Sequence, residues 1–444
     1  MGSRVLSEGR RLRFGIFFAL YVMQGIPAGF ALTALTNYMT AEGIGPERVG
    51  GFAAAVGLPW AFQFAWGPLI DRFQGSRMGR RRPWLMATQL LAFLASLGVV
   101  LAGDPVGRLD LLTLALFVHS VFASVQDASA DAMAISVIPD SERGRVNAFM
   151  RGGFLFGAGA GAAVLSQVLR HSGFAAAALV QSGLLLALTV PTFLVRERPG
   201  DLAWPWSRRR GDVEIDPRPG RAGGPAGPTE LKLGRIFVEL ASAMLAPRNL
   251  RLFAAIAVVS TSGSVFVRAF SMHLIRDLGW TDTGLSTFSG TYGTFGALVA
   301  IVAGGTLSDW IGHRRMLGLV MLGMSCFLFG FCGLGAWWAR PGVAQVGLIL
   351  WSTFDPAFSV AAMPVLMAVC RRGIEGSQFT AYMAFVNLCD IAGSYLAGHA
   401  LGFAPAPAIG LGCGVAVLLA LGAILREIPA PAVAPIEPIP ARPD

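Results

Sequence analysis

Long apolar runs follow one another along almost the whole chain, and short polar segments separate them. A run of about 20 apolar residues is the length that an α-helix needs to cross the hydrocarbon core of a bilayer. The pattern therefore predicts twelve membrane-spanning helices and an all-α integral membrane protein as the fold class. The predicted spans are residues 14–37, 49–70, 84–103, 111–138, 146–169, 174–195, 251–275, 284–308, 315–336, 343–369, 377–402 and 405–425.

The composition supports a membrane protein, because 54% of the residues are hydrophobic and only 14% are charged, against about 25% charged in soluble proteins. The cysteines lie in or beside apolar segments, without a CxxC pair or a histidine at metal-ligand spacing. We expect them to be small buried side chains, and we expect no metal site and no other cofactor. The motifs of ATPases, zinc proteases and serine hydrolases are missing from the sequence, so it does not indicate an enzyme.

The formal net charge is +9, and the arginines concentrate in alternate loops. Because they lie between apolar spans, the positive-inside rule explains them better than nucleic-acid binding does. The rule predicts that both termini are cytoplasmic, and the basic N-terminal segment runs into the first span instead of forming a cleavable signal. We expect a monomer that crosses the membrane several times and has the lipid bilayer as a partner.

A change of composition divides the chain. Residues 196–250 are rich in Pro, Gly and charge, which is typical of a flexible cytoplasmic linker. The prediction is an N-terminal six-helix bundle at 1–195, the linker at 196–250, a C-terminal six-helix bundle at 251–428 and a disordered tail at 429–444. Parallel repeats of six spans related by a pseudo-twofold axis are typical of secondary transporters.

Two short loops, at equivalent places in the two halves, resemble each other. Each has a glycine, an aspartate four residues later and then a basic cluster. Glycine permits close helix approach, and the aspartate can cap a helix or pair with arginine. The loops resemble the signature loop of the major facilitator superfamily. This resemblance implies a cytoplasmic gate formed by Gly67, Asp71, Arg72 and Arg81 in the first copy and Gly305, Asp309, Arg314 and Arg315 in the second.

Two carboxylates lie one helical turn apart in the fourth predicted span, Asp127 and Asp131. A charge at the centre of a membrane helix costs at least about 2.5 kcal/mol, so this stripe is expected to face a cavity or a bundle interior. Asp127 is the stronger candidate for proton coupling, and Asp131 is a second candidate that we expect to pair with Arg151 of the fifth span. A purely structural charge network remains the alternative for all three residues.

Further polar residues fall inside predicted spans and are candidates for substrate binding. Asn387 and Asp390 lie on one face of the eleventh span, and Asp355 precedes a proline in the tenth. Arg268 can hold a substrate carboxylate, and Gln24 forms part of a polar kink in the first span. Arg151 is a further candidate for substrate binding, unless its role is only to pair with Asp131. Glycines repeated every four residues at 153, 157 and 161 predict a helix-packing surface.

Several motifs together resemble the AmpG-like branch of the major facilitator superfamily, also called the peptide–acetyl-coenzyme A transporter family. The likeness covers most of the chain and is strongest in the first five spans. The residues that carry it are 24–27, 58–60, 66–72, 79–85, 126–127, 131–132, 142–144, 366–367, 370 and 377–380. The long Arg-rich linker and the aspartates at 355 and 390 depart from the family pattern.

The resemblance implies an inner-membrane importer driven by the proton gradient. Substrates of the family include muropeptides, some siderophores and, in eukaryotic members, acetyl-coenzyme A. We therefore expect a proton-coupled symporter for a polar, anionic solute such as a muropeptide. A siderophore or an acyl-coenzyme A-like cofactor is the alternative substrate, and a membrane sensor without transport activity is the alternative class of protein.

Overall fold

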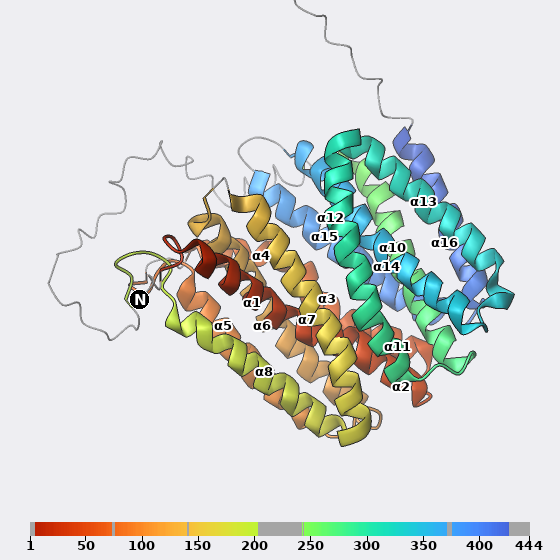
Figure 1. Ribbon diagram of the computed structural model, residues 1–444, viewed down its shortest axis with the longest axis horizontal. Coiled ribbons are helices and arrows are strands. Elements are labelled where there is room, and N and C mark those ends of the chain that lie inside the picture. The colour runs from red at the N-terminus through yellow and green to blue at the C-terminus, as the bar shows by residue number, and fades with distance from the viewer. Residues whose placement is uncertain are drawn as a thin grey trace, which may run out of the picture.

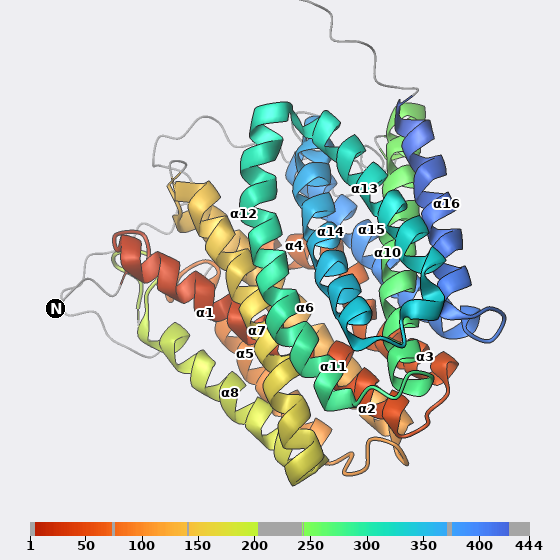
Figure 2. The same ribbon diagram turned by 45° about the vertical axis from the view of Figure 1, so that its right-hand side comes forward.

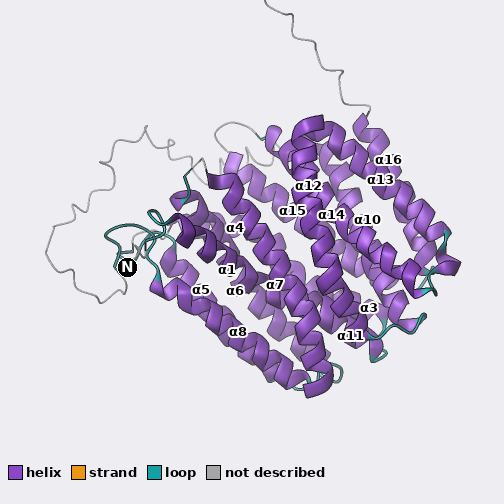
Figure 3. Ribbon diagram, in the orientation of Figure 1, coloured by secondary structure: helices purple, strands orange, loops and turns teal. Residues whose placement is uncertain are grey.

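The computed structural model describes residues 5–72, 76–139, 142–202, 242, 244–370 and 375–425. Apart from an isolated bridge between Val5 and Arg196, the regular structure in these ranges is helical (Figure 3). The elements are α1 (Arg10–Gly29), the π-helix η1 (Phe30–Leu35), α2 (Thr36–Ala41), α3 (Pro46–Ala61), α4 (Gln63–Arg72), α5 (Arg82–Val100), α6 (Leu109–Val137), α7 (Arg143–Ser172), α8 (Phe174–Leu194), α10 (Pro247–Arg276), α11 (Asp282–Phe288), the π-helix η3 (Ser289–Gly293), α12 (Thr294–Ile311), α13 (His313–Gly333), the 3-10 helix η4 (Gly335–Trp337), α14 (Pro341–Ala368), α15 (Glu375–Ala400) and α16 (Ala406–Leu425).

Ten helical stretches of the described chain are long and apolar enough to cross a membrane. The other two predicted spans, 49–70 and 377–402, correspond to α3 with α4 and to α15. Pro59 lies one turn before the break between α3 and α4, where the Phe62 N–H donates to the Pro59 carbonyl at 3.2 Å. α15 is long enough to span but carries several polar side chains, which lower its hydropathy. The predicted all-helical membrane fold is confirmed.

The helices form two groups. α1 to α8, the N-terminal bundle, lie on one side of the molecule, and α10 to α16, the C-terminal bundle, lie on the other (Figures 1 and 2). Each group has its own apolar core, although Met272 of α10 is buried in the core of the N-terminal bundle. The division of the chain into domains stays a prediction, because much of the linker and all of the tail lie outside the described residues.

The two bundles meet closely at one end, which carries Ala41, Ser172 and Asp282 and which we call the outer end after the predicted topology. A Cβ added at Gly398 of α15 would lie 2.3 Å from the carbonyl oxygen of Pro46 in α3. A Cβ at Gly159 of α7 would lie 2.3 Å from the carbonyl oxygen of Gly290 in η3. Glycine thus lets the backbones of the two bundles touch, as in other tightly packed membrane helices.

Within the N-terminal bundle, α1 packs along α7. A Cβ at Gly153, Gly157 or Gly161 would come within 2.2–2.5 Å of a carbonyl oxygen of α1. The predicted packing surface of the fifth span is therefore confirmed, and its partner is the first span. Because α1 lies against both α6 and α7, its side chains are the neighbours of the polar groups on these two helices.

Candidate functional site

Asp127 of α6 is held by an amide. The Gln63 side chain donates a hydrogen bond to its carboxylate, and the interruption between α3 and α4 places Gln63 at the first position of α4. Trp66, one turn later, donates to Ser124 at 3.0 Å and fixes α4 against α6. The buried Gln24 of α1 lies beside the same carboxylate, although its Nε2 has no hydrogen-bond partner within the described residues.

Asp131 has a different partner from the expected one. The Tyr21 hydroxyl of α1 donates to its Oδ1, whereas no ion pair within 4.0 Å joins Asp131 to Arg151 in the described chain. The cause is the packing of α1 along α7, which places Tyr21 rather than Arg151 next to Asp131. Arg151 is instead exposed, and its charge acts on both aspartates from a greater distance.

The C-terminal bundle contributes a second charged group. Arg268 of α10 pairs with Asp390 of α15 at 3.3 Å, and Ser264 donates to the same carboxylate at 2.6 Å. The predicted anion ligand Arg268 is therefore partly engaged in this state. Asn387, one turn before Asp390, lies at the bundle interface, where its Nδ2 donates to the carbonyl of Trp60 at 3.5 Å.

Charged groups of the two bundles lie within electrostatic range of one another. Asp355 of α14 lies within electrostatic range of Asp390 in its own bundle and of Arg151 in the other. The side chains of Asp355, Asp390 and Arg151 are exposed. Since the outer end is closed, we infer that water enters from the opposite, inner end, and we describe the structure as inward-facing.

A polar network that the sequence did not reveal closes the outer end. Arg170 of α7 contacts Glu42 at 2.8 Å in its own bundle and Asp282 of α11 at 3.0 Å in the other bundle. The Arg170 guanidinium also lies over the Tyr38 ring, 5.0 Å from its centroid. Two hydrogen bonds between the bundles lie beside these ion pairs, Asn37 to Ser286 at 2.9 Å and Gln167 to Thr287 at 3.1 Å.

The predicted gate residues lie at the inner end. Gly67, Asp71 and Arg72 lie in α4, and Gly305 and Asp309 lie in α12. The side chains of Asp71, Arg72 and Asp309 are outside the described residues, so their contacts remain predictions. Among the described residues, a Cβ at Gly67 or at Gly305 would meet nothing within 4 Å, so neither glycine brings two described helices into close contact. Arg314 and Arg315 are exposed at the start of α13.

The basic cluster of the first gate loop is hydrogen-bonded to residues of its own, N-terminal bundle. The Arg81 backbone N–H donates to the Glu197 carboxylate at 3.0 Å, and Glu197 is fully buried. The Arg82 guanidinium donates to the carbonyl of Phe193 at 2.8 Å, near the end of α8. Burial raises the pKa of nearby Asp201, whose carboxylate accepts from the Arg198 N–H at 2.8 Å.

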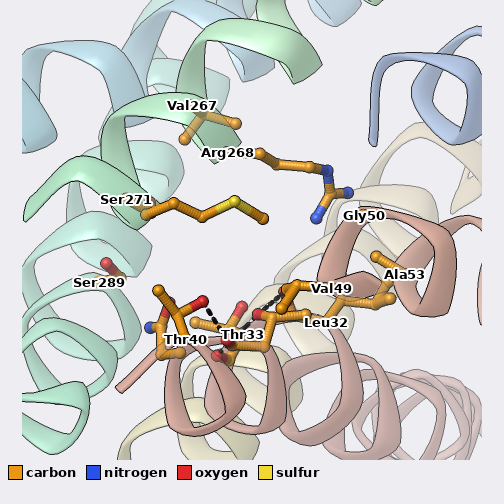
Figure 4. A pocket seen from close by; sticks show the side chains of 13 residues that line it. Leu32, Thr33, Thr40, Val49, Gly50, Ala53, Val267, Arg268, Ser271 and Ser289 are labelled. Carbon is orange, nitrogen blue, oxygen red and sulfur yellow. Dashed lines mark hydrogen bonds between the residues drawn. The ribbon is translucent and has the colours of Figure 1, made fainter. Parts of the chain in front are cut away.

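A cavity of about 270 Å³ lies between the bundles toward the outer end (Figure 4). Its walls come from the first and second spans on one side and from α10 and η3 on the other. Arg268 reaches across it toward Gly50, and Thr33 and Thr40 lie on the opposite wall (Figure 4). Of the predicted substrate ligands, Arg268 alone is among its lining residues.

Comparison with known proteins places these features in a family. The family model described as Major Facilitator Superfamily matches residues 14–394. The anhydromuropeptide permease of Escherichia coli strain K12 is 24% identical over 413 residues, which are 90% of this chain and 77% of that protein. An uncharacterized protein of Haemophilus influenzae is 29% identical over 138 residues, 30% of this chain and 32% of that protein. The putative transporter AmpG 3 of Rickettsia prowazekii is 28% identical over 102 residues, 22% of this chain and 24% of that protein.

The resemblance found in the sequence is thus confirmed as distant homology over most of the chain. The protein is a multi-pass membrane transporter for a small molecule and not an enzyme. The family model, which matches most of the chain, shows that the chain belongs to the Major Facilitator Superfamily, in agreement with its membrane-length helices and its two helix groups.

Proposed function

We propose that the protein is a proton-coupled importer of a polar, anionic solute of the anhydromuropeptide class. It would work by alternating access as a monomer in the cytoplasmic membrane, with both termini in the cytoplasm. The name of the Escherichia coli relative, which aligns with 90% of this chain, supports the substrate class. Residues Gln24, Asp127, Asp131, Arg151, Arg268, Asp355, Asn387 and Asp390 form the proposed site.

The observation that carries the proton coupling is the hydrogen bond from Gln63 to Asp127. An amide has both a donor nitrogen and an acceptor oxygen, so it can stabilise a carboxyl group in either protonation state. A directly paired cation would instead hold the carboxylate ionised. Asp127 is therefore equipped to bind and release a proton without breaking up its surroundings.

The proton changes the free energy of closing the two bundles around Asp127. An aspartate charge at the centre of a membrane helix costs about 2.5–3.5 kcal/mol on insertion scales. Protonation of Asp127 removes this cost when the bundles close around the residue, and release of the proton at the inner end restores the charge. The proton gradient thereby drives the cycle in the direction of import.

Arg268 supplies the complementary charge for the solute. In the inward-facing structure it is paired with Asp390, as expected for a site that has released its anion. A solute carboxylate entering from outside would compete with Asp390 for the guanidinium, since both offer the same acceptor group. The Arg268–Asp390 pair then reforms when the solute leaves, which keeps the empty site free of an unpaired charge.

Uptake into proteoliposomes under an imposed pH gradient tests the proposal. The panel contains an anhydromuropeptide, a siderophore and an acyl-coenzyme A. We expect gradient-dependent uptake of the anhydromuropeptide, and loss of that dependence in Asp127→Asn. Asp110→Asn is the matched control, because Asp110 lies in the first turn of the same helix and is exposed.

Uptake that ignores the gradient would refute the proton coupling. Uptake of the siderophore or of the acyl-coenzyme A in place of the anhydromuropeptide would refute the substrate class. Absence of all transport from a folded protein would instead favour a membrane sensor.

A further inference from the structure

The cavity between the bundles has a lining that suits a particular kind of chemical group. It is lined by Leu32, Thr33, Thr36, Asn37, Thr40, Val49, Gly50, Ala53, Val267, Arg268, Ser271, Met272 and Ser289. Its volume of about 270 Å³ is just below the range of about 300–1,000 Å³ typical of drug-sized ligands. It therefore suits one part of a larger solute rather than a whole one.

The hydroxyl groups of the lining fall into two sets. Those of Thr36 and Thr40 donate to the backbone carbonyls of Leu32 and Thr36, at 3.0 and 2.7 Å, so toward a ligand they can only accept. Those of Thr33, Ser271 and Ser289 make no hydrogen bond within the described part of the chain. Together the two sets offer acceptors and donors to a neutral group that carries both.

Arg268 is the one charged residue of the lining. Its Nη2 contacts Asp390 at 3.3 Å and its Nε contacts Ser264 at 3.4 Å. Its Nη1 has no hydrogen-bond partner among the described residues, so a donor remains for an anionic group. The same side chain thus borders the neutral cavity and pairs with the charged residue Asp390.

Two π-helical segments contribute to the walls. η1 supplies Leu32 and Thr33 from the N-terminal bundle, and η3 supplies Ser289 from the C-terminal bundle. π-helices are rare and occur mostly as single turns within α-helices, frequently at functional sites. Their presence on both sides of one cavity is an independent indication that the cavity is a functional site.

We propose that this cavity receives the neutral, hydroxyl-bearing part of the solute, sized like one sugar ring, while an anionic group of the solute binds Arg268. The inference rests on the proposed function and assigns a separate place to one part of its substrate. Because both bundles form the walls, the cavity exists only while the outer end is closed. A ligand that fills it therefore stabilises this closed state over the open one.

Removal of the free hydroxyls tests the assignment. The variant carries Thr33→Val, Ser271→Ala and Ser289→Ala, and the matched control carries Thr113→Val and Thr306→Val, which lie outside the cavity. Uptake of labelled anhydromuropeptide is inhibited in turn by its disaccharide alone and by its peptide alone. We expect inhibition by the disaccharide to weaken at least about 10-fold in the variant, because three hydroxyl groups that can hydrogen-bond the ligand are lost.

Inhibition by the peptide should stay within about twofold, a selectivity that general damage to the protein would not produce. Ser271→Leu serves as a second variant that fills the cavity, and it should also weaken the disaccharide selectively. Equal inhibition by the disaccharide in wild type and variants would overturn the assignment while leaving the proposed function intact. Failure of the wild type to take up the conjugate would overturn the proposed function and this inference with it.

Discussion

The ion pairs of Arg170 at the outer end lead to a quantitative prediction. Arg170 and Glu42 have side chains that are 38% and 36% exposed, so their pair contributes little, about 0.2–1 kcal/mol. Asp282 is only 4% exposed, and removal of one partner from a buried pair costs about 3–5 kcal/mol. Because solvent reaches Arg170 itself, we place the cost of Arg170→Gln between these limits, at about 1–3 kcal/mol.

That cost applies only while the outer end is closed, since Asp282 regains water when the bundles separate. Arg170→Gln should therefore shift the equilibrium toward the outward-open state by about 5- to 150-fold. The two populations can be measured by double electron–electron resonance. Spin labels would be placed at positions 108 and 340, which are exposed on different bundles, in a variant without the native cysteines.

We expect a longer distance between the labels to become populated in Arg170→Gln. Arg276→Gln is the control, since Arg276 is an exposed arginine at the outer end of α10 that makes no ion pair among the described residues. An unchanged distance distribution in Arg170→Gln would refute the conclusion that Arg170 holds the outer end closed.

Two further predictions concern close packing and buried polar groups. Gly159→Val should abolish uptake and populate the longer distance between the outer-end labels, because its Cβ would lie 2.3 Å from the Gly290 carbonyl oxygen. Gly183→Val is the control and should retain uptake, because a Cβ at Gly183 meets no described residue within 4 Å. Gln181→Met should raise the free energy of unfolding by about 1–3 kcal/mol, because neither polar atom of this buried amide has a partner within the described residues. A melting temperature in detergent that falls or stays constant in Gln181→Met would contradict this estimate.

The positions of the spans could be predicted because a membrane helix must be apolar over a set length. The span predicted at 111–138, for example, is α6 at Leu109–Val137. The same rule does not predict where a span deviates from an α-helix. The break before Gln63 and the π-helices at Phe30–Leu35 and Ser289–Gly293 depend on tertiary packing that hydropathy does not record.

Candidate residues could be predicted from their cost in a membrane, but their partners could not. The aspartates at 127 and 131 stand out in the sequence because a charged side chain within a membrane helix has a high free-energy cost. Tyr21 was missed because a tyrosine in a span is unremarkable, and it meets Asp131 only because α1 packs along the glycines of α7. The interaction of Arg170 with Asp282 joins residues far apart in sequence, each of which looks like an ordinary loop charge on its own.

The coupling of solute and proton movement tests the central claim most directly. Proteoliposomes without an imposed gradient, loaded with a pH-sensitive dye, would be given an inward gradient of anhydromuropeptide. The account predicts that solute entry acidifies the lumen in the wild type and not in Asp127→Asn. Solute entry in the wild type without any change of luminal pH would contradict it.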